Sequence, residues 1–215
     1  EETFALVTTA GVHPPDPDPY DLAGSPSWRL IPGDVASDQL MVTHEHYDHR
    51  HADQDINCVF PIDRLRELAD EGVIGGVGDK HLGFMGFSQL IRDLYERAAP
   101  EMAKIIERSR ADAVLLTAGC PLCHRTVVAI QRELEMLGLP TVLITLVPKA
   151  SAEMGPPRAI HPVGFTLGDA LGLPHRPDIQ RAVLLDALRR WEAREEPGHI
   201  WELEYPAYTP DPAIT

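Results

Sequence analysis

The sequence predicts an α/β fold, in which helices cover both faces of a mostly parallel sheet. Short, continuous apolar runs such as 3–9 and 113–117 are typical of strands that are buried on both faces. Longer segments between such runs, for example 61–71, carry apolar residues at helical spacing. The alternation of these two patterns along 215 residues is typical of a Rossmann-like three-layer sandwich.

The length and composition predict one domain. A chain of 215 residues, 44% of them hydrophobic, is long enough to bury a core without disulfides or a structural metal. Three cysteines are also too few for a disulfide scaffold. We therefore expect a single α/β domain over residues 1–215, with a proline-rich loop at 13–33 and a proline-rich tail at 197–215.

Strands are expected where apolar runs end at glycine, proline or polar residues. The expected core strands are 3–9, 39–43, 113–117 and 141–146, with a short edge strand at 28–31 and a fifth strand at 158–163. The histidine-rich segment 44–57 and the glycine-rich segment 72–86 show no periodicity, which predicts loops.

Helices are expected where apolar residues recur every three or four positions. These segments are 61–71, 89–110, 127–137 and 178–195. Pro61 stands at the start of the first segment and Gly72 follows its end, as is common at helix boundaries. Pro100 predicts a kink or a join between two helices.

The charge of the chain excludes two classes of function. Thirty-three acidic and 19 basic residues give a net charge of −14, whereas nucleic-acid binding and attachment to anionic membranes both need basic surface. No apolar run approaches the roughly 18 residues of a membrane span, and no signal peptide is visible. We expect a cytoplasmic protein with a small-molecule substrate, and a homodimer is one expected state.

The first candidate site is a Cys-x-x-Cys motif formed by Cys120 and Cys123. It lies between the expected strand 113–117 and the following helix, at the edge where open α/β sheets bind ligands. Free N–H groups at a helix start favour a thiolate over a thiol. We expect Cys120 to be the nucleophile and Cys123, one turn later, to resolve an adduct as a disulfide, with His124 close by. One alternative is two small buried residues at a helix start. Another is attachment of a c-type haem to Cys-x-x-Cys-His, which needs export and an exposed segment, whereas this motif lies between core elements.

The second candidate site is the histidine cluster that follows the expected strand 39–43. Its pattern, His44-x-His46-x-Asp48-His49, is similar to the signature of metallo-β-lactamase-type hydrolases, where imidazoles and a carboxylate hold zinc. One hypothesis is therefore a hydrolase that depends on zinc or another divalent metal held by these four residues. Without a metal, His44, His46 and Asp48 would line the pocket of Cys120 and position substrate or move protons. A polar surface loop is the third alternative.

Both clusters together resemble the selenoprotein B family of the glycine/sarcosine/betaine reductases, with the related D-proline reductase subunit further off. The likeness covers segments 5–11, 44–48, 53–65, 72–75, 114–117 and 138–142. Its most specific part is Asp55-Ile56-Asn57 followed by Phe60-Pro61-Ile62-Asp63. Cys120 stands where the reductases carry selenocysteine.

The resemblance implies a thiol-dependent oxidoreductase that reductively cleaves a carbon–heteroatom bond. The chalcogenide would attack a substrate carbon activated by the pyruvoyl group of a partner subunit, and the adduct would pass to a carrier protein. A partner reductase subunit or a thiol reductant protein is therefore expected. A non-catalytic subunit, or a module that senses thiols or metals, is the remaining hypothesis.

Four further residues are candidates for substrate binding. They are Tyr47, Asp55, Asn57 and His124. Asp55 and Asn57 could equally cap the helix that follows them, because Asp and Asn are common caps.

Overall fold

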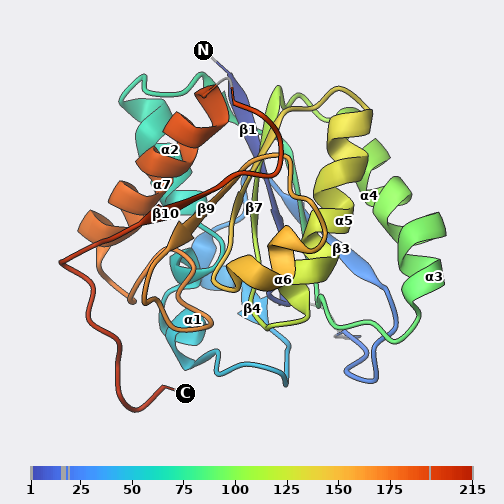
Figure 1. Cartoon of the computed structure of the whole chain (residues 1–215), viewed down its shortest axis with the longest axis horizontal. Helices are drawn as coiled ribbons and strands as arrows, with labels where there is room; N and C mark the ends of the chain where they lie inside the picture. The colour runs from blue at the N-terminus through green and yellow to red at the C-terminus, as the bar shows by residue number, and fades with distance from the viewer. Residues whose placement is uncertain (1, 16–17, 19, 194, 215) are drawn as a thin grey trace.

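The structure is a computed structural model that describes residues 2–15, 18, 20–193 and 195–214. Eight strands form the central sheet: β1 (Thr3–Thr8), β3 (Trp28–Pro32), β5 (Gly76–Val77), β6 (Lys80–Phe84), β7 (Ala113–Thr117), β8 (Thr141–Ile144), β9 (Ala159–Pro162) and β10 (Ile200–Leu203). Their order is β10-β9-β8-β7-β1-β6-β3, and β5 pairs with β1 (Figure 1). All pairs are parallel except β3 with β6, which confirms the predicted mostly parallel sheet.

Alternate residues of the central strands enter two separate cores. On β1, Phe4 and Leu6 belong to one core, whereas Ala5 and Val7 belong to the other. Strands β7 and β8 divide in the same way. Because successive side chains of a strand point to opposite faces, a strand buried on both faces reads as a continuous apolar run.

Helices cover both faces, as the sequence predicts. Helices α2 (Ile62–Asp70) and α7 (Pro177–Glu192) pack on one face, and α4 (Ala99–Glu107) and α5 (Cys123–Met136) pack on the other (Figure 1). The expected helices 61–71, 89–110, 127–137 and 178–195 are confirmed with shifted ends. Pro100 lies in the first turn of α4, directly after a π-helical turn. The three-layer sandwich is confirmed.

Short elements complete the described chain. They are β2 (Val12–His13) and β4 (Met41–Val42), the helices α1 (Arg50–Gln54), α3 (Ile91–Asp93) and α6 (Pro148–Ala152), the π-helical turn Leu94–Ala98, and the 3₁₀ turns Ser37–Gln39 and Ile56–Cys58. Among the described residues, no helix is long and apolar enough to cross a membrane.

The prediction of a second core strand at 39–43 is wrong. Only Met41–Val42 form a strand, and it pairs antiparallel with β2 in a separate two-stranded sheet. Met41 is 52% exposed. A short apolar run fits a small surface ladder as well as a core strand, and the run alone does not separate the two.

The prediction of loops at 72–86 and 44–57 is also wrong in part. β5 and β6 occupy the glycine-rich segment, and β6 lies between β1 and β3. Gly83 lies within β6, and this position requires glycine because a Cβ there would collide with the carbonyl oxygen of Val12. A glycine in a strand thus marks a close backbone approach. The histidine-rich segment contains α1 and the 3₁₀ turn Ile56–Cys58.

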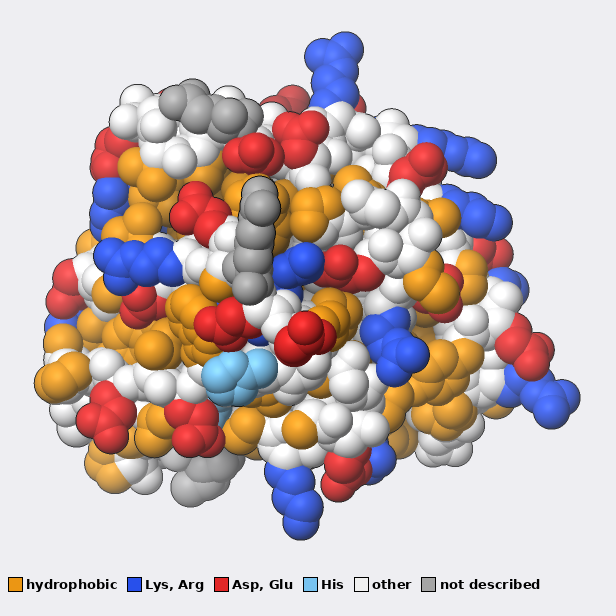
Figure 2. Space-filling view, turned by 45° about the horizontal axis from the view of Figure 1, so that its top comes forward, with side chains coloured by type: hydrophobic (Ala, Val, Ile, Leu, Met, Phe, Trp, Pro, Cys, Tyr) orange, Lys and Arg blue, Asp and Glu red, His pale blue; other side chains and the backbone are white. Residues whose placement is uncertain are grey.

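The proline-rich segments both contribute to the sheet. The predicted edge strand at 28–31 is confirmed as β3, and β10 in the tail pairs with β9. The division into one domain with a loop and a tail stays a prediction. Figure 2, in which the amino ends of the parallel strands come forward, shows acidic, basic and apolar side chains interspersed on this side of the molecule.

Candidate functional site

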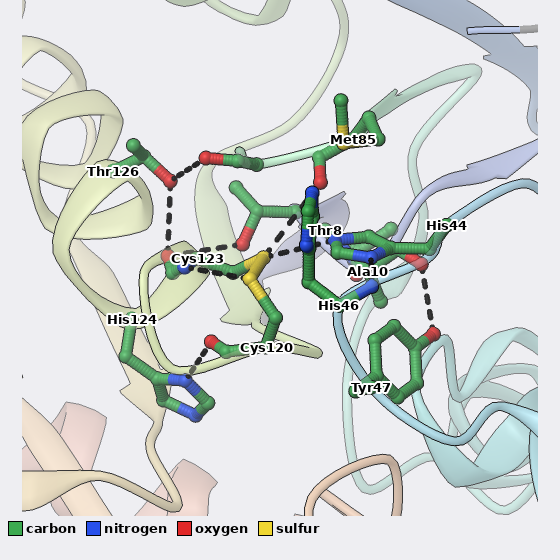
Figure 3. The surroundings of a disulfide bond; sticks show 12 residues. Thr8, Ala10, His44, His46, Tyr47, Met85, Cys120, Cys123, His124 and Thr126 are labelled. Carbon is green, nitrogen blue, oxygen red and sulfur yellow. Dashed lines mark hydrogen bonds between the residues drawn. A yellow bond between two sulfur atoms is a disulfide. The ribbon is translucent and has the colours of Figure 1, made fainter. Parts of the chain in front are cut away.

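Cys120 and Cys123 form a disulfide between the carboxyl end of β7 and the start of α5 (Figure 3). Helix α5 begins at Cys123, so Cys120 lies just before it. The backbone N–H of Cys123 donates to Cys120 Sγ over 3.2 Å. This N–H is one of those that a helix start leaves without an intrahelical partner. In the reduced protein it would stabilise negative charge on Cys120.

The disulfide is enclosed by the rest of the chain. Both cysteines have 0% exposure. Cys123 Sγ lies 3.7 Å from the carbonyl oxygen of Met85, and Gly86 lies against the same sulfur. The carboxyl ends of β6 and β7 therefore meet at the disulfide, at the sheet edge that the sequence predicts for the site.

His44 lies beside Cys123 and carries its proton on Nε2. Its Nδ1 accepts the backbone N–H of His46 at 3.0 Å, so the proton of a neutral ring stands on Nε2. Nε2 lies 3.1 Å from Cys123 Sγ (Figure 3). Burial, assisted by the charges of His46 and His49, lowers the pKa of His44 to about 4. A hydrogen bond to the Met85 backbone raises the pKa and only partly offsets the effect of burial. At neutral pH His44 is therefore uncharged, with its Nε2–H directed at Cys123 Sγ beside the carbonyl oxygen of Met85.

His124 holds the cysteine loop rather than facing a sulfur. Its Nδ1 donates to the carbonyl oxygen of Cys120 at 2.7 Å, and its Nε2 accepts the N–H of Leu146 at 3.0 Å. Both ring nitrogens are thus occupied, and burial lowers the pKa of His124 to about 4. The ring ties the Cys-x-x-Cys loop to the chain after β8, which fixes the position of Cys120.

His46 and Tyr47 lie next to His44 in the surroundings of the disulfide (Figure 3). The ring centroids of His44 and Tyr47 are 4.9 Å apart, and those of His44 and His46 are 5.5 Å apart. Tyr47 donates its hydroxyl to the carbonyl oxygen of Ala10 at 2.8 Å. Its ring lies so close over Gly119 that a Cβ there would collide with it. The structure therefore brings three residues of the histidine cluster to the cysteine pair.

Asp48 and His49 have polar partners away from the sulfurs, and the His49 ring also packs against Tyr47 with its centroid 6.0 Å away. Asp48 accepts hydrogen bonds from the backbone N–H and the guanidinium of Arg50, and the guanidinium lowers the pKa of Asp48 to about 2. His49 Nδ1 lies 2.8 Å from a carboxylate oxygen of Asp53. The start of α1 thus takes both side chains into local contacts.

The four residues of the zinc hypothesis do not converge on one point. Within the described part of the chain, His44, Cys120 and Cys123 make up the one group of three metal-ligating side chains, with ligand atoms within 4.8 Å of one another. A metal on Nε2 of His44 would need the ring proton on Nδ1, where the N–H of His46 already donates. The observed arrangement suits a hydrogen bond from His44 to sulfur better than a metal bond.

Asp55 and Asn57 cap local structure and also line a cavity. Asp55 accepts the backbone N–H of Asn57 at 3.0 Å, and Asn57 Oδ1 accepts the N–H of Asp63 at the start of α2. Both residues line a cavity of about 570 Å³ together with Arg64 and His175. Neither side chain makes a hydrogen bond to the cysteine pair. The larger cavities, of about 720 and 660 Å³, are lined by neither cysteine.

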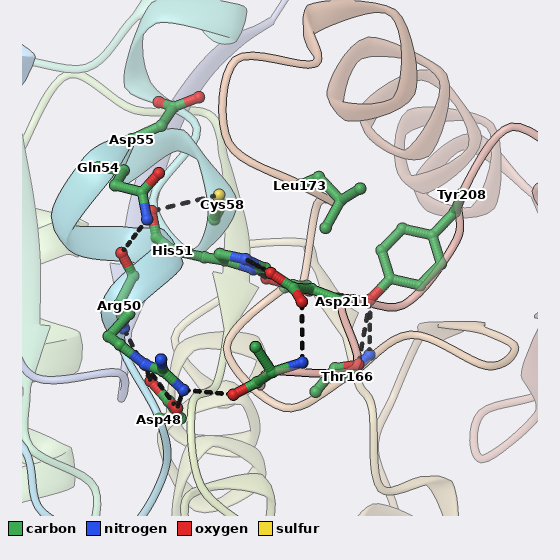
Figure 4. Close-up of polar contacts among 12 residues, drawn as sticks. Asp48, Arg50, His51, Gln54, Asp55, Cys58, Thr166, Leu173, Tyr208 and Asp211 are labelled. Atoms are coloured by element: carbon green, nitrogen blue, oxygen red, sulfur yellow. Dashed lines mark hydrogen bonds and ion pairs between the residues drawn. The ribbon is translucent and has the colours of Figure 1, made fainter. Parts of the chain in front are cut away.

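A buried His–Asp pair near the tail was not expected from the sequence. His51 Nδ1 lies 2.8 Å from Asp169, which also accepts the Tyr208 hydroxyl at 2.8 Å. His51 Nε2 lies 3.4 Å from Asp211 of the tail (Figure 4). Burial raises the pKa of Asp169. His51 and Asp169 are more than a hundred positions apart in sequence, so no local pattern predicts their contact.

Gly86 is the backbone position on which the packing around Cys123 depends most. Its φ is +79°, and a Cβ there would lie 2.5 Å from Cys123 Sγ and from the carbonyl oxygen of Thr9. We expect Gly86→Ala to lower the free energy of unfolding by about 3 to 5 kcal/mol, because both strain and overlap are introduced. Urea unfolding of the oxidised protein measures this change.

Gly138→Ala is the matched control. Gly138 has a similar φ of +87° but nothing within 4 Å of an added Cβ, so only backbone strain of about 1 to 2 kcal/mol is expected. Equal losses for the two variants would contradict the assigned packing at Cys123.

Comparison with known proteins places the chain among reductase components. The family model for glycine/sarcosine/betaine reductase selenoprotein B matches residues 1–119. The chain is 40% identical over 203 residues to D-proline reductase subunit gamma of Acetoanaerobium sticklandii, which covers 94% of this chain and 84% of that protein.

Other relatives are longer. Glycine reductase complex component B subunit gamma of Carboxydothermus hydrogenoformans is 31% identical over 173 residues, 75% of this chain and 40% of the relative. Betaine reductase complex component B subunit beta of Peptoclostridium acidaminophilum is 30% identical over 157 residues, 69% and 35% of the two chains. The chain thus spans less than half the length of these two relatives. No solved structure matches it.

Proposed function

Because the chain belongs to the glycine/sarcosine/betaine reductase selenoprotein B family, we propose that it is the thiol-bearing component of a reductase complex. Cys120 and Cys123 would cycle between a dithiol and a disulfide during reductive cleavage of a carbon–heteroatom bond. The relatives are named as components of D-proline, glycine and betaine reductases, which supports a small-molecule substrate and partner subunits.

The observation that carries the proposal is the Cys120–Cys123 disulfide with His44 hydrogen-bonded to Cys123. Two sulfur atoms that bond in the folded protein can store and release two electrons without a large rearrangement. The position of Cys120, between the end of β7 and the helix start, favours its thiolate. These features support the roles of Cys120 as nucleophile and Cys123 as resolving thiol.

The proposed reaction has two steps. The Cys120 thiolate attacks the substrate carbon, the sulfur–carbon bond forms, and the heteroatom leaves with the electron pair of its bond. The Cys123 thiolate then attacks Cys120 Sγ, the disulfide forms, and the carbon keeps the electron pair and takes a proton. The substrate is reduced by two electrons and the dithiol is oxidised. A partner subunit would activate the carbon, and a thiol reductant would restore the dithiol.

His44, His46 and Tyr47 form the cover of this site in the proposal. Substrate has to reach a sulfur that has 0% exposure, so the ring of Tyr47, which lies over Gly119, has to move during the reaction. In the proposal, the bond-forming steps at the two sulfurs do not involve Asp48, Asp55 or Asn57. A cytoplasmic location and a homodimer stay predictions.

A thiol count tests the proposal. Cys58 is the free, buried cysteine and the other two are bonded, so the protein oxidised with diamide and unfolded without reductant should show one thiol per chain. Reduction should give three, and reoxidation should return one. Metal content is measured on the same sample. Three thiols after oxidation, or zinc bound at one per chain that prevents the oxidation, would overturn the proposal.

A further inference from the structure

We propose that His44, through its hydrogen bond to Cys123 Sγ, makes Cys123 the sulfur that leaves as a thiolate when the disulfide opens and attacks as a thiolate when it closes. Cys120 is then the sulfur that forms bonds with substrate and reductant. The inference rests on the proposed dithiol–disulfide cycle, in which Cys120 is the nucleophile, and adds to it the residue that sets this polarity. It follows from what surrounds Cys123 Sγ, and not from the position of either cysteine in the family pattern.

Cys123 Sγ is packed against three parts of the chain. His44 Nε2 lies 3.1 Å from its sulfur on one side, and Gly86 lies against the same sulfur. The carbonyl oxygen of Met85 lies 3.7 Å away. A nucleophile that attacked Cys123 Sγ would have to enter among these contacts. Attack on Cys120 leaves these contacts of Cys123 in place.

His44 also stabilises the charge that such an attack produces. When an external thiolate attacks Cys120 Sγ, the new sulfur–sulfur bond forms, the old one breaks, and its electron pair moves to Cys123 Sγ. The Nε2–H of His44 then donates to that thiolate, and a hydrogen bond to a charged sulfur is stronger than one to a neutral sulfur. The neutral ring donates a hydrogen bond and keeps its proton.

The same contact serves the reverse direction. With an adduct on Cys120, the Cys123 thiolate held by His44 attacks Cys120 Sγ, and the adduct leaves with the electron pair of its bond. The backbone N–H of His46 makes the assignment specific, because it fixes His44 Nδ1 as an acceptor and so leaves the proton on Nε2. His46 thus contributes through its backbone, a role that its side-chain type does not predict.

Trapping the mixed disulfide tests the polarity in the wild-type protein. The oxidised protein is treated with glutathione, quenched with N-ethylmaleimide, and mapped by fragmentation mass spectrometry. We expect glutathione on Cys120 and maleimide on Cys123 in most of the trapped protein. Glutathione mainly on Cys123 would overturn the inference while leaving the dithiol–disulfide cycle intact. Failure to form any disulfide would overturn the proposed function instead.

Variants of His44 test its role as a hydrogen-bond donor to Cys123. His44→Ala should slow formation of the mixed disulfide about tenfold, the effect of one hydrogen bond to a charged group. His44→Gln should restore most of the rate, because an amide N–H can take the place of Nε2–H. If alanine and glutamine behave alike, His44 is a packing residue and the inference fails.

Single-cysteine proteins separate charge stabilisation from access. In the Cys120→Ser protein, adding His44→Ala should raise the thiol pKa of Cys123 by about one. The pKa is measured from the absorbance of the thiolate as a function of pH. In Cys123→Ser the pKa of Cys120 should stay within a few tenths of its value. An equal rise at both sulfurs would contradict a contact specific to Cys123.

Discussion

If the proposed reaction holds, replacing Cys120 by serine should abolish reductive turnover, with a loss of at least about 10³-fold, because the group proposed to form the covalent bond to substrate is removed. Serine keeps the size of the side chain but is not a nucleophile at neutral pH, and it cannot form the disulfide. The measurement is the dithiothreitol-dependent turnover of the complex assembled with each variant. Retained turnover would place the chemistry elsewhere in the chain.

Cys123→Ser and Cys58→Ser are the two controls. Without Cys123 the first step proceeds but the adduct cannot be resolved, so mass spectrometry should find the substrate fragment held on Cys120. Cys58 is buried and burial raises the pKa of its thiol, so its replacement should leave turnover unchanged. An adduct on Cys123 in the Cys120→Ser protein would reverse the assigned roles.

The sandwich could be predicted from sequence because its core elements have local patterns. β1, β7 and β8 are continuous apolar runs that end at the site, and α2 and α7 carry apolar residues at helical spacing. β6 was not predicted because its segment is rich in glycine, which favours a loop, whereas Gly83 is required by the close approach of the Val12 backbone. Such a requirement exists only between chain segments that are distant in sequence.

The candidate site could likewise be predicted where its residues follow a local pattern. The Cys-x-x-Cys motif between β7 and α5 identifies the pair, and the histidine cluster supplies His44 beside it. The alternate spacing of the cluster does not reveal that Asp48 turns to Arg50 at the start of α1. The pair of His51 and Asp169 joins residues 118 positions apart, and only the packed chain brings them together.

Acid should unfold this protein readily, because three buried histidines have to remain neutral in the folded state. Burial is the largest cause that lowers the pKa of His44, His81 and His124 from 6.5 to about 4. Below about pH 6.5 the unfolded chain binds these protons and the folded chain does not, so stability falls with falling pH towards about pH 4. Asp169 acts in the opposite direction, since its raised pKa favours the folded state in acid, but it is one group against three.

Each histidine should lower the free energy of unfolding by about 2 kcal/mol between about pH 7 and about pH 5, and the three together by about 6 kcal/mol. Urea unfolding of the oxidised protein at both pH values measures this loss. His81→Gln is a suitable control, because the amide oxygen can still accept the N–H of Leu6 that Nδ1 of His81 accepts in the native protein. This variant should lose about a third less stability on acidification than the wild type. An unchanged pH dependence in His81→Gln would show that His81 binds its proton as readily in the folded state as in the unfolded chain. A wild-type protein equally stable at both values would contradict the neutral state assigned to the three rings, including His44.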